Sequence, residues 1–122
     1  GFIAKVTDTV KNHDVSIDVC TTSETSFSFS INSKDYSYKL QKELAEIAKV
    51  SVIKGVTNVC IIGNDITKDS KIMFGIFTIC AANNIRVISI SVSASFNNIT
   101  FLINDNDKNE TVRVLHRSLI PK

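Results

Sequence analysis

Residues 2–31, FIAKVTDTVKNHDVSIDVCTTSETSFSFSI, hold a helix followed by two strands, and this pattern decides the fold. Apolar side chains recur at helical spacing through residues 2–10, and the turn-forming residues 12–14 end that helix. Residues 15–19 and 27–31 then alternate apolar with polar side chains. Such alternation is typical of strands that bury one face, so a helix and two half-buried strands are expected.

A second helix and a short strand complete this first pattern. A polar turn at residues 32–35 follows the second strand. The next helix is marked by apolar residues with the spacing of one helix face, Leu40, Leu44 and Ile47. Residues 49–53 alternate again, which predicts a short strand before the next turn.

The same order of elements then repeats. Residues 56–62 form an apolar run that predicts a strand, and the next helix begins at Asp69 or Ser70, either of which can cap it. Its buried face is expected to comprise apolar residues at helical spacing: Ile72, Met73, Ile76, Phe77 and Cys80. Residues 83–84 stop this helix as residues 12–14 stop the first one.

Two further strands and one helix close the second copy. The strands are expected at residues 85–90 and 99–103. The helix opens at Asp107, where Glu110 three residues on completes a capping box, and it ends at Pro121. Its buried stripe is expected to comprise Val112, Leu115 and Leu119.

Corresponding positions of the two copies lie about 70 residues apart, as Val15 and Ile85 do. We therefore expect an α+β chain of two ferredoxin-like βαββαβ modules, residues 1–54 and 55–122, with antiparallel sheets and helices on one face. The first module lacks its leading strand, because residue 1 already starts the helix, and the second lacks a closing strand. Since a missing strand leaves backbone groups unpaired, the chain is interpreted as a piece of a larger protein.

Composition and charge argue against several classes of protein. The net charge is +2 at pH 7 with scattered Lys and Arg, whereas a nucleic-acid binder shows a basic stripe. No run approaches the ~20 apolar residues of a membrane span and no signal peptide is visible, so a cytoplasmic location without membrane contact is expected. His13 and His116 have no partners at ligand spacing, so no metal site is expected. Cys20, Cys60 and Cys80 lie in apolar stretches and are expected to be buried, reduced thiols.

Several runs resemble the C-terminal regulatory region of the aspartokinase family, which contains tandem ACT modules. They are GFIAKV (1–6), VSIDV (15–19) and TTSE (21–24) for the first module, and VCIIGND (59–65), NIRVI (84–88) and LHRSL (115–119) for the second. The resemblance covers essentially the whole chain in order and points to the lysine-sensitive, monofunctional type. It implies that one module is inserted within the other, so that segments upstream supply the missing strand.

The resemblance also implies that lysine binds the first module at the two-fold interface of a homodimer. The residues carried over for this site are Gly1, Phe2, Ile3, Ile17, Asp18, Thr22, Ser23 and Glu24. Backbone N–H groups at a helix start, those of Phe2 and Ile3, can receive the α-carboxylate, and Gly1 leaves room for its approach. Thr22 and Ser23 can orient the ligand.

Asp18 and Glu24 supply two carboxylates for two ammonium groups, which favours lysine over threonine or methionine. From composition alone, each would be an ordinary solvated charge and Phe2 an ordinary core residue. In the second module the position that matches Asp18 is Ile88, so no second ligand is expected.

The function implied by the resemblance is allosteric. The chain would be the non-catalytic part of an aspartate kinase, through which lysine feedback-inhibits phosphorylation of aspartate by ATP. ATP and Mg²⁺ would serve a kinase domain upstream. No glycine-rich phosphate loop and no kinase-type lysine motif is visible, so no catalytic residue or cofactor is expected here.

Two other interpretations stay open. A stand-alone ACT-type amino-acid-binding module could regulate another metabolic enzyme, although the missing strand argues against it. The same topology serves RNA binding in RRM domains, which stack bases on exposed sheet aromatics. Phe27 and Phe29, however, share one strand face with Ile31 and are expected in the core.

Overall fold

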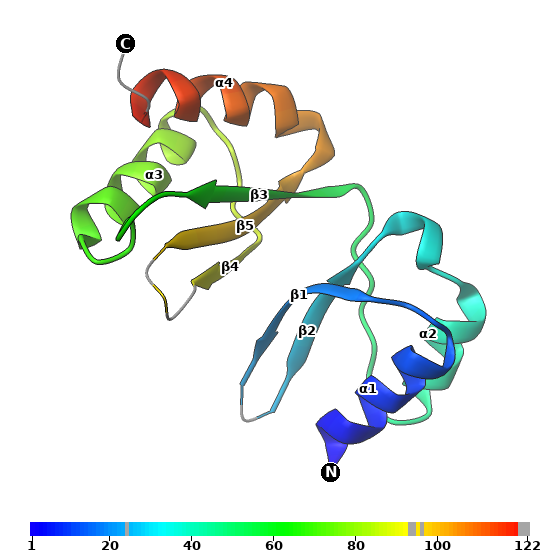
Figure 1. Cartoon of the computed structure of the whole chain (residues 1–122). Helices are drawn as coiled ribbons and strands as arrows, with labels where there is room; N and C mark the ends of the chain where they lie inside the picture. Colours follow the sequence, from blue (N-terminus) through cyan, green and yellow to red (C-terminus); the bar gives the residue numbers. More distant parts are fainter. Residues whose placement is uncertain (24, 93–94, 96, 120–122) are drawn as a thin grey trace. The chain divides into compact units, whose positions relative to one another are not determined.

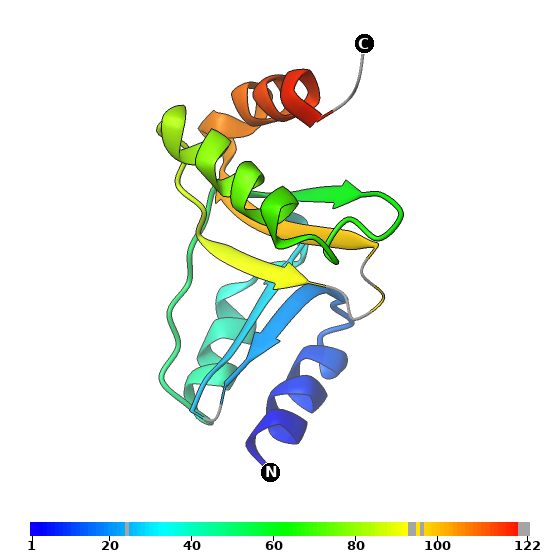
Figure 2. The ribbon, with the colours of Figure 1, turned by 90° about the vertical axis from the view of Figure 1, so that its left-hand side faces the viewer.

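The computed structural model describes residues 1–23, 25–92, 95 and 97–119. The chain divides into two compact units, unit 1 (Gly1–Lys54) and unit 2 (Gly55–Lys122). In each unit two α-helices lie on one face of an antiparallel sheet (Figures 1 and 2), which confirms the α+β class expected from the sequence. Among the described helices, none is long and apolar enough to cross a membrane.

Unit 1 packs two helices on a two-stranded sheet. Its elements are α1 (Phe2–Asn12), β1 (Ile17–Thr22), β2 (Phe27–Ile31), a 3₁₀ turn (Ser33–Asp35) and α2 (Tyr38–Ala45). The helices bury Val6, Val10, Leu40 and Leu44, and the sheet packs Ile17, Phe27, Phe29 and Ile31 against them. Ser37 begins α2, because its side chain accepts a hydrogen bond from Leu40 N–H at 3.1 Å.

Unit 2 has a larger sheet with strand order β3-β5-β4, in which both pairs are antiparallel. Its elements are β3 (Val56–Ile62), α3 (Ser70–Ala82), β4 (Ser89–Val92), β5 (Asn98–Asn104), a 3₁₀ turn (Asp105–Asp107) and α4 (Lys108–Leu119). The buried core comprises Ile76, Cys80, Ile85, Ile99, Phe101, Ile103, Val114 and Leu115. Every other residue of β5 from Ile99 to Ile103 is buried under the helices, as the sequence alternation predicts.

The internal repeat is visible in how α1 and α3 end. Asp14 and Asn84, 70 positions apart, both have φ of +57°, a left-handed conformation that Asp and Asn adopt more readily than most residues. After each, the next N–H donates to the carbonyl of a buried helix residue, Val10 in α1 and Cys80 in α3. The two copies therefore turn from helix to sheet in the same way, which confirms the predicted repeat.

The strand predicted at residues 49–53 is wrong. Within the described chain this run makes no backbone hydrogen-bond ladder, and the side chains of Val52 and Ile53 are 41% and 64% exposed. Of its apolar residues, Val50 alone packs on the core of unit 1. A strand needs a neighbour for its N–H and C=O groups, and in the described part of unit 1 β2 pairs with β1 only.

A β-bulge shifts the register of β1 against β2 between Ile17 and Val19. Ile17 opposes Ile31, but after a shift in register Val19 opposes Ser30. Ile17 therefore packs on the core of unit 1, whereas Val19 is not among the residues that do. Half-buried and exposed residues still alternate along β1, so the half-buried strand predicted from the sequence is confirmed, and the bulge changes the pairing with β2.

The strand predicted at residues 85–90 begins later, since β4 starts at Ser89. Ile85 is buried and Val87 packs on the core, which accounts for the apolar alternation there. Before the ladder begins, a single bond reaches β5, from Ile88 N–H to Leu102 O at 2.8 Å. Apolar alternation in this segment reflects core packing more than strand pairing.

The predicted capping box at the last helix is wrong. Asp107 lies in the 3₁₀ turn, and α4 begins at Lys108. The Glu110 carboxylate accepts hydrogen bonds from Arg113 Nε and Nη2 at 3.0 and 2.6 Å. Glu110 is therefore engaged by its own helix and not by the backbone at the helix start.

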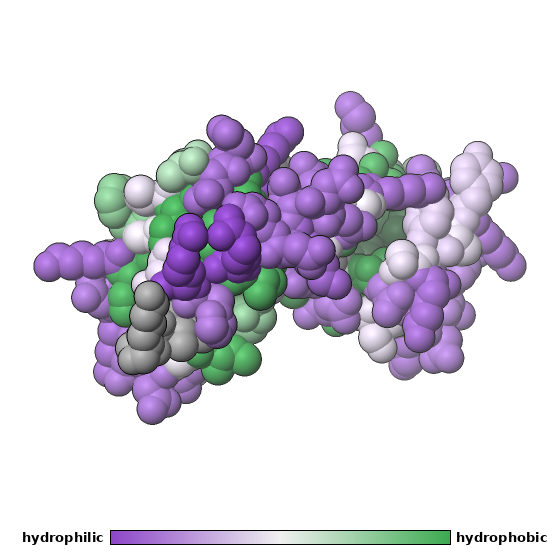
Figure 3. All heavy atoms as spheres, turned by 90° about the horizontal axis from the view of Figure 1, so that it is seen from above, coloured by the Kyte–Doolittle hydropathy of each residue, from purple (hydrophilic) through white to green (hydrophobic). Residues whose placement is uncertain are grey.

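The predicted buried stripe of α4 is also partly wrong. Val112 is 54% exposed, because the face that meets the core carries Thr111, Val114 and Leu115. Thr111 can be buried there, since its hydroxyl donates to Asp107 O at 2.7 Å. The outward side of α4 is hydrophilic, as the purple surface in Figure 3 shows, and carries the exposed residues Lys108, Arg113, His116 and Arg117.

Of the three cysteines expected to be buried, Cys80 is, and burial raises the pKa of its thiol. Cys20 on β1 and Cys60 on β3 are exposed. Both strands alternate between half-buried and exposed residues, and these two cysteines occupy exposed positions. An apolar neighbourhood in sequence does not decide which face of a strand a residue takes.

Candidate effector site

The start of α1 offers backbone donors that the rest of the described chain does not use. Gly1 is the N-cap without a side-chain cap, and the first helical hydrogen bond runs from Lys5 N–H to Gly1 O at 3.1 Å. The N–H groups of Phe2 and Ile3 have no acceptor among the described residues. Such a helix start attracts a carboxylate through its free N–H groups and the helix dipole.

The side chains at this helix start are open to solvent. Phe2 and Ile3 are 41% and 45% exposed, so neither is a core residue. A Cβ added to Gly1 would meet nothing within 4 Å, so the chain's own atoms do not require glycine there. That Gly1 leaves room for a bound carboxylate stays a prediction.

Ser23 is engaged within the β1–β2 hairpin. Its N–H donates to Ser26 O at 2.9 Å, its hydroxyl accepts from Ser26 N–H at 3.1 Å, and the two hydroxyls lie 2.6 Å apart. The side chain therefore stabilises the turn, as serine commonly does. Thr22 is exposed at the end of β1, and Glu24 lies outside the described residues.

A hollow of about 680 Å³ joins the start of α1 to this hairpin. Its lining comes from three segments and comprises Phe2, Thr25, Ser26, Phe27, Ser28, Ala48, Lys49 and Ser51. The structure thus brings Phe2 to the hairpin, as a shared site requires. Sequence reasoning missed Lys49 and Ser51, because it placed both on a strand.

Asp18 and Ile17 lie at the other end of β1. Asp18 and Thr22 are four positions apart, a distance of about 13 Å at about 3.3 Å per residue. Asp18 is exposed at the bulge, while Ile17 packs on the core of unit 1. One chain therefore does not gather all the predicted residues around one hollow.

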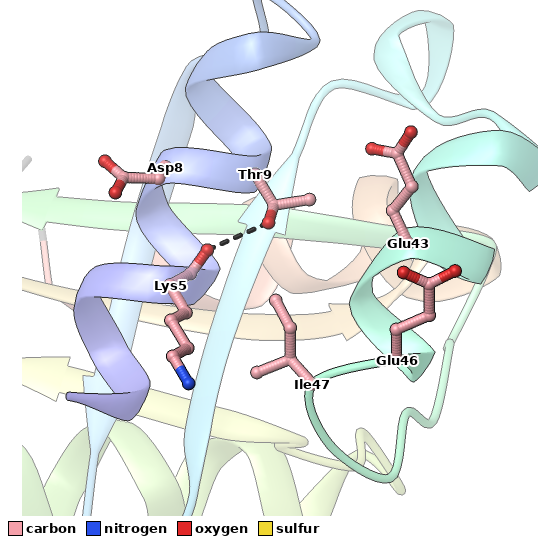
Figure 4. Close-up of a pocket in the computed structure, with 6 residues that line it drawn as sticks. All are labelled: Lys5, Asp8, Thr9, Glu43, Glu46 and Ile47. Carbon is pink, nitrogen blue, oxygen red and sulfur yellow. Dashed lines mark hydrogen bonds between the residues drawn. The ribbon is translucent and has the colours of Figure 1, made fainter.

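A second hollow, of about 470 Å³, lies between α1 and α2 (Figure 4). Its lining comprises Lys5, Asp8, Thr9, Glu43, Glu46 and Ile47. The lining carries three carboxylates and one amine, and Glu43 is already engaged, because its Oε2 lies 2.5 Å from His13 Nε2. None of the predicted site residues lines this hollow, and no pattern in the sequence indicated it.

In unit 2 a side chain of the chain itself caps the first helix. Asp69 caps α3, and its Oδ1 accepts from Lys71 N–H at 2.9 Å. The repeat position of Asp18 is Ile88, which supplies no carboxylate. Within the described residues, no group of three or more His, Cys, Asp or Glu side chains could hold a metal ion.

Residues 59–119, half of the chain, match the ACT domain family. Over 98% of its length the chain is 31% identical to the lysine-sensitive aspartokinase 3 of Escherichia coli strain K12. It spans 28% of the length of that relative.

Two solved structures extend the likeness to three dimensions. E. coli aspartokinase III in complex with aspartate and ADP (R-state) has a TM-score of 0.86 at 28% identity. The same enzyme in complex with lysine and aspartate (T-state) has a TM-score of 0.83 at 29% identity. Each match covers 99% of this chain and 28% of the other. The chain therefore belongs to the ACT domain family and is similar, over nearly its whole length, to the regulatory region of aspartokinases.

Proposed function

We propose that the chain is the amino-acid-sensing regulatory part of an aspartate kinase, through which lysine inhibits the phosphorylation of aspartate by ATP. The E. coli relative supports lysine as the effector, because it is named lysine-sensitive and its structure was solved in complex with lysine and aspartate. In this proposal a kinase domain upstream uses ATP and Mg²⁺, and the protein works in the cytoplasm.

The observation that carries the proposal is the uncapped start of α1 beside a hairpin rich in hydroxyls. The free N–H groups of Phe2 and Ile3 suit the α-carboxylate of an amino acid. The first helix of unit 2 differs, because the Asp69 side chain caps α3. Sensing is therefore assigned to unit 1.

A second copy of the chain would complete the site. In the described part of unit 1, β1 pairs only with β2, so its other edge is free. If two copies of β1 pair antiparallel about Cys20, then Asp18 of one copy lies opposite Thr22 of the other, since both are two residues from Cys20. The carboxylate that stands about 13 Å from the hairpin in one chain would then reach the hairpin of the other.

Lysine titration of an Asp18→Asn variant tests the site in the protein that contains the kinase domain. Loss of one charge-assisted hydrogen bond, roughly 1.5–3 kcal/mol, should weaken lysine binding about tenfold to a hundredfold and relieve inhibition. Basal kinase activity should not change. Asp8→Asn, an exposed carboxylate on α1, is the matched control and should leave inhibition intact. Unchanged inhibition in Asp18→Asn, or thermal stabilisation by threonine and not by lysine, would contradict the proposal.

The dimer can be tested by oxidation. Cys20 would face its own copy at the two-fold axis, where antiparallel partners have Cα atoms about 4.5–5.5 Å apart, within the range of a disulfide. Mild oxidation should cross-link the chain, Cys20→Ser should abolish the cross-link, and Cys60→Ser should not. A monomer by light scattering at micromolar concentration would count against this assembly.

A further inference from the structure

Two serines, Ser23 and Ser26, close the turn between β1 and β2. Ser23 N–H donates to Ser26 O at 2.9 Å, and Ser26 N–H donates to Ser23 Oγ at 3.1 Å. Thr25 N–H donates to the same side-chain oxygen at 3.4 Å, and the two serine hydroxyl oxygens lie 2.6 Å apart. The Ser23 hydroxyl oxygen therefore contacts two backbone N–H groups and a second hydroxyl.

The direction of the hydrogen bond between the two hydroxyls follows from counting donors and acceptors. A serine hydroxyl has one proton and two lone pairs. Both lone pairs of Ser23 Oγ accept backbone N–H groups, those of Thr25 and Ser26. Ser23 therefore donates its proton to Ser26 Oγ, and the hydroxyl proton of Ser26 is left for an acceptor outside the turn.

This proton borders the hollow of about 680 Å³, because Ser26 lines that hollow and Ser23 does not. Among the described residues, none accepts the proton from Ser26. The described lining carries no carboxylate, and its one charged side chain is Lys49. Phe2, whose N–H has no acceptor in the described part of the chain, lines the same hollow. A hydroxyl donor, an ammonium group and a helix start together favour an anion.

We propose that Ser26 binds the effector, with its hydroxyl donating to the α-carboxylate of the bound amino acid. Ser23 is then a positioning residue, which directs the proton of Ser26 into the hollow. This inference rests on the proposed function, and it separates two tasks within the site. Asp18 would select the side chain of the effector, whereas Ser26 would contribute affinity for any amino acid.

Titrations with lysine and with lysinamide test the role of Ser26 in the protein that contains the kinase domain. Ser26→Ala should weaken lysine binding about tenfold to a hundredfold, the loss of one hydrogen bond to a charged group. Ser26→Thr keeps a hydroxyl and should retain most of the affinity. Ser28→Ala, a serine of β2 that lines the same hollow, is the matched control and should bind lysine as the unsubstituted protein does.

Lysinamide carries a neutral amide in place of the carboxylate, so Ser26→Ala should weaken its binding much less than that of lysine. Unchanged lysine affinity in Ser26→Ala, or an equal loss for lysine and lysinamide, would overturn the proposal.

A double-mutant cycle tests Ser23 as the positioning residue. Ser23→Ala should weaken lysine binding, and Ser26→Ala added to it should cost little more, because the two hydroxyls act as one unit. Amide exchange of Thr25 and Ser26 should become faster in Ser23→Ala but not in Ser26→Ala, which separates the turn from the ligand contact. Additive losses of lysine affinity would refute the role of Ser23.

Threonine and methionine, titrated in the same way, separate this inference from the choice of lysine as effector. If one of them binds in place of lysine, the proposed function is wrong about the effector, yet Ser26→Ala should still weaken that ligand, since all three share the α-carboxylate. A bound amino acid whose affinity does not change in Ser26→Ala would overturn the inference alone. Binding of none of the three would overturn both.

Discussion

Units 1 and 2 share an order of elements but differ at the start of their first helix. α1 begins at Gly1 without a side-chain cap, whereas α3 begins at Asp69, whose carboxylate accepts from Lys71 N–H. The same fold thus leaves its backbone donors open in one unit and satisfies them internally in the other. A side-chain cap satisfies the backbone donors at the start of α3, and uncapped donors such as those of α1 can accept an external anion.

The two units also differ in how much they bury. Among the described residues, unit 2 has a core of eight buried residues under a three-stranded sheet, and unit 1 has four beside a two-stranded sheet. Since apolar burial is the main stabilising term in folding, unit 2 should be the more stable unit of this chain. Unit 1, to which sensing is proposed to belong, therefore has the smaller core.

Truncating one core aromatic in each unit should give the largest effect. Phe101→Ala in unit 2 removes a side chain that is 1% exposed and packs edge-to-face with Phe77. It should lower the free energy of unfolding of unit 2 by about 3–5 kcal/mol. Phe29→Ala in unit 1 removes a half-buried ring and should cost clearly less.

Denaturant unfolding followed by residue-resolved probes in each unit would measure both changes. An equal loss in the two variants would contradict the view that the core of unit 1 is the weaker one.

Many features of the two units could be predicted from the sequence, because these features depend on residues close together in the chain. The turns at Asp14 and Asn84 and the cap at Asp69 follow from residue types at fixed offsets. The helix-facing residues of β2 follow from alternation. These predictions needed no knowledge of distant neighbours.

The predictions that failed share one cause. Each depended on a contact that a local sequence pattern does not specify. Residues 49–53 have strand-like alternation but no described strand to pair with. The bulge beside Asp18 is fixed by register with β2, and after it Val19 opposes Ser30. Val112 was misplaced because a satisfied threonine, Thr111, takes the buried position instead. For the same reason, the distance between Asp18 and the hairpin emerged only from the structure.

The next largest effect on stability is expected at the ends of α1 and α3, where His13 and Asn83 occupy equivalent positions of the repeat. His13 reaches across to α2, with Nε2 2.5 Å from Glu43 Oε2, whereas its repeat position, Asn83, donates to Ile79 O of its own helix at 2.8 Å. His13→Asn should therefore loosen the α1–α2 contact and destabilise unit 1 by about 1–2 kcal/mol.

Glu43→Gln should have a similar but smaller effect, since an amide can still accept a hydrogen bond from His13. Thermal unfolding of unit 1 at pH 7 measures both variants. If His13→Asn melts as the unsubstituted chain does, the two helices are held by apolar packing alone.

Removing the cap of α3 and adding one to α1 tests the difference between the two helix starts. Asp69→Ala should destabilise α3 by about 1 kcal/mol, because it removes the acceptor for Lys71 N–H. Gly1→Asp should instead stabilise α1 by a few tenths of a kcal/mol, since the added side chain meets open space. The same carboxylate would compete with a bound ligand, so lysine binding should weaken on the order of tenfold.

Helicity and lysine titration of Gly1→Asp, with Gly1→Ala as the size control, would measure both effects. Unaltered lysine affinity in Gly1→Asp would show that the open helix start is not where the ligand carboxylate binds.

The smallest effect concerns the exposed pair on α4, Glu110 and Arg113. The hydrogen bond from Arg113, aided by the charges of Arg113 and Arg117, lowers the pKa of Glu110 below its ordinary value. The folded state thus binds fewer protons than the unfolded state near that pKa. The resulting stability is complete above the ordinary pKa of about 4.3 and is lost as pH falls through the lowered one.

Glu110→Gln should therefore melt slightly below the unsubstituted chain at pH 7, and the gap should close as pH falls below about 4. The change must be small, because both side chains are exposed and solvent screens their attraction. Glu46→Gln, an exposed carboxylate in unit 1, controls for removal of a charge and should leave the melting of unit 2 unchanged at either pH. Calorimetry at pH 7 and pH 3 gives the comparison. A gap of the same size at both pH values would mean that the pair orders the surface of α4 without contributing pH-linked stability, and that both units depend on their cores and caps alone.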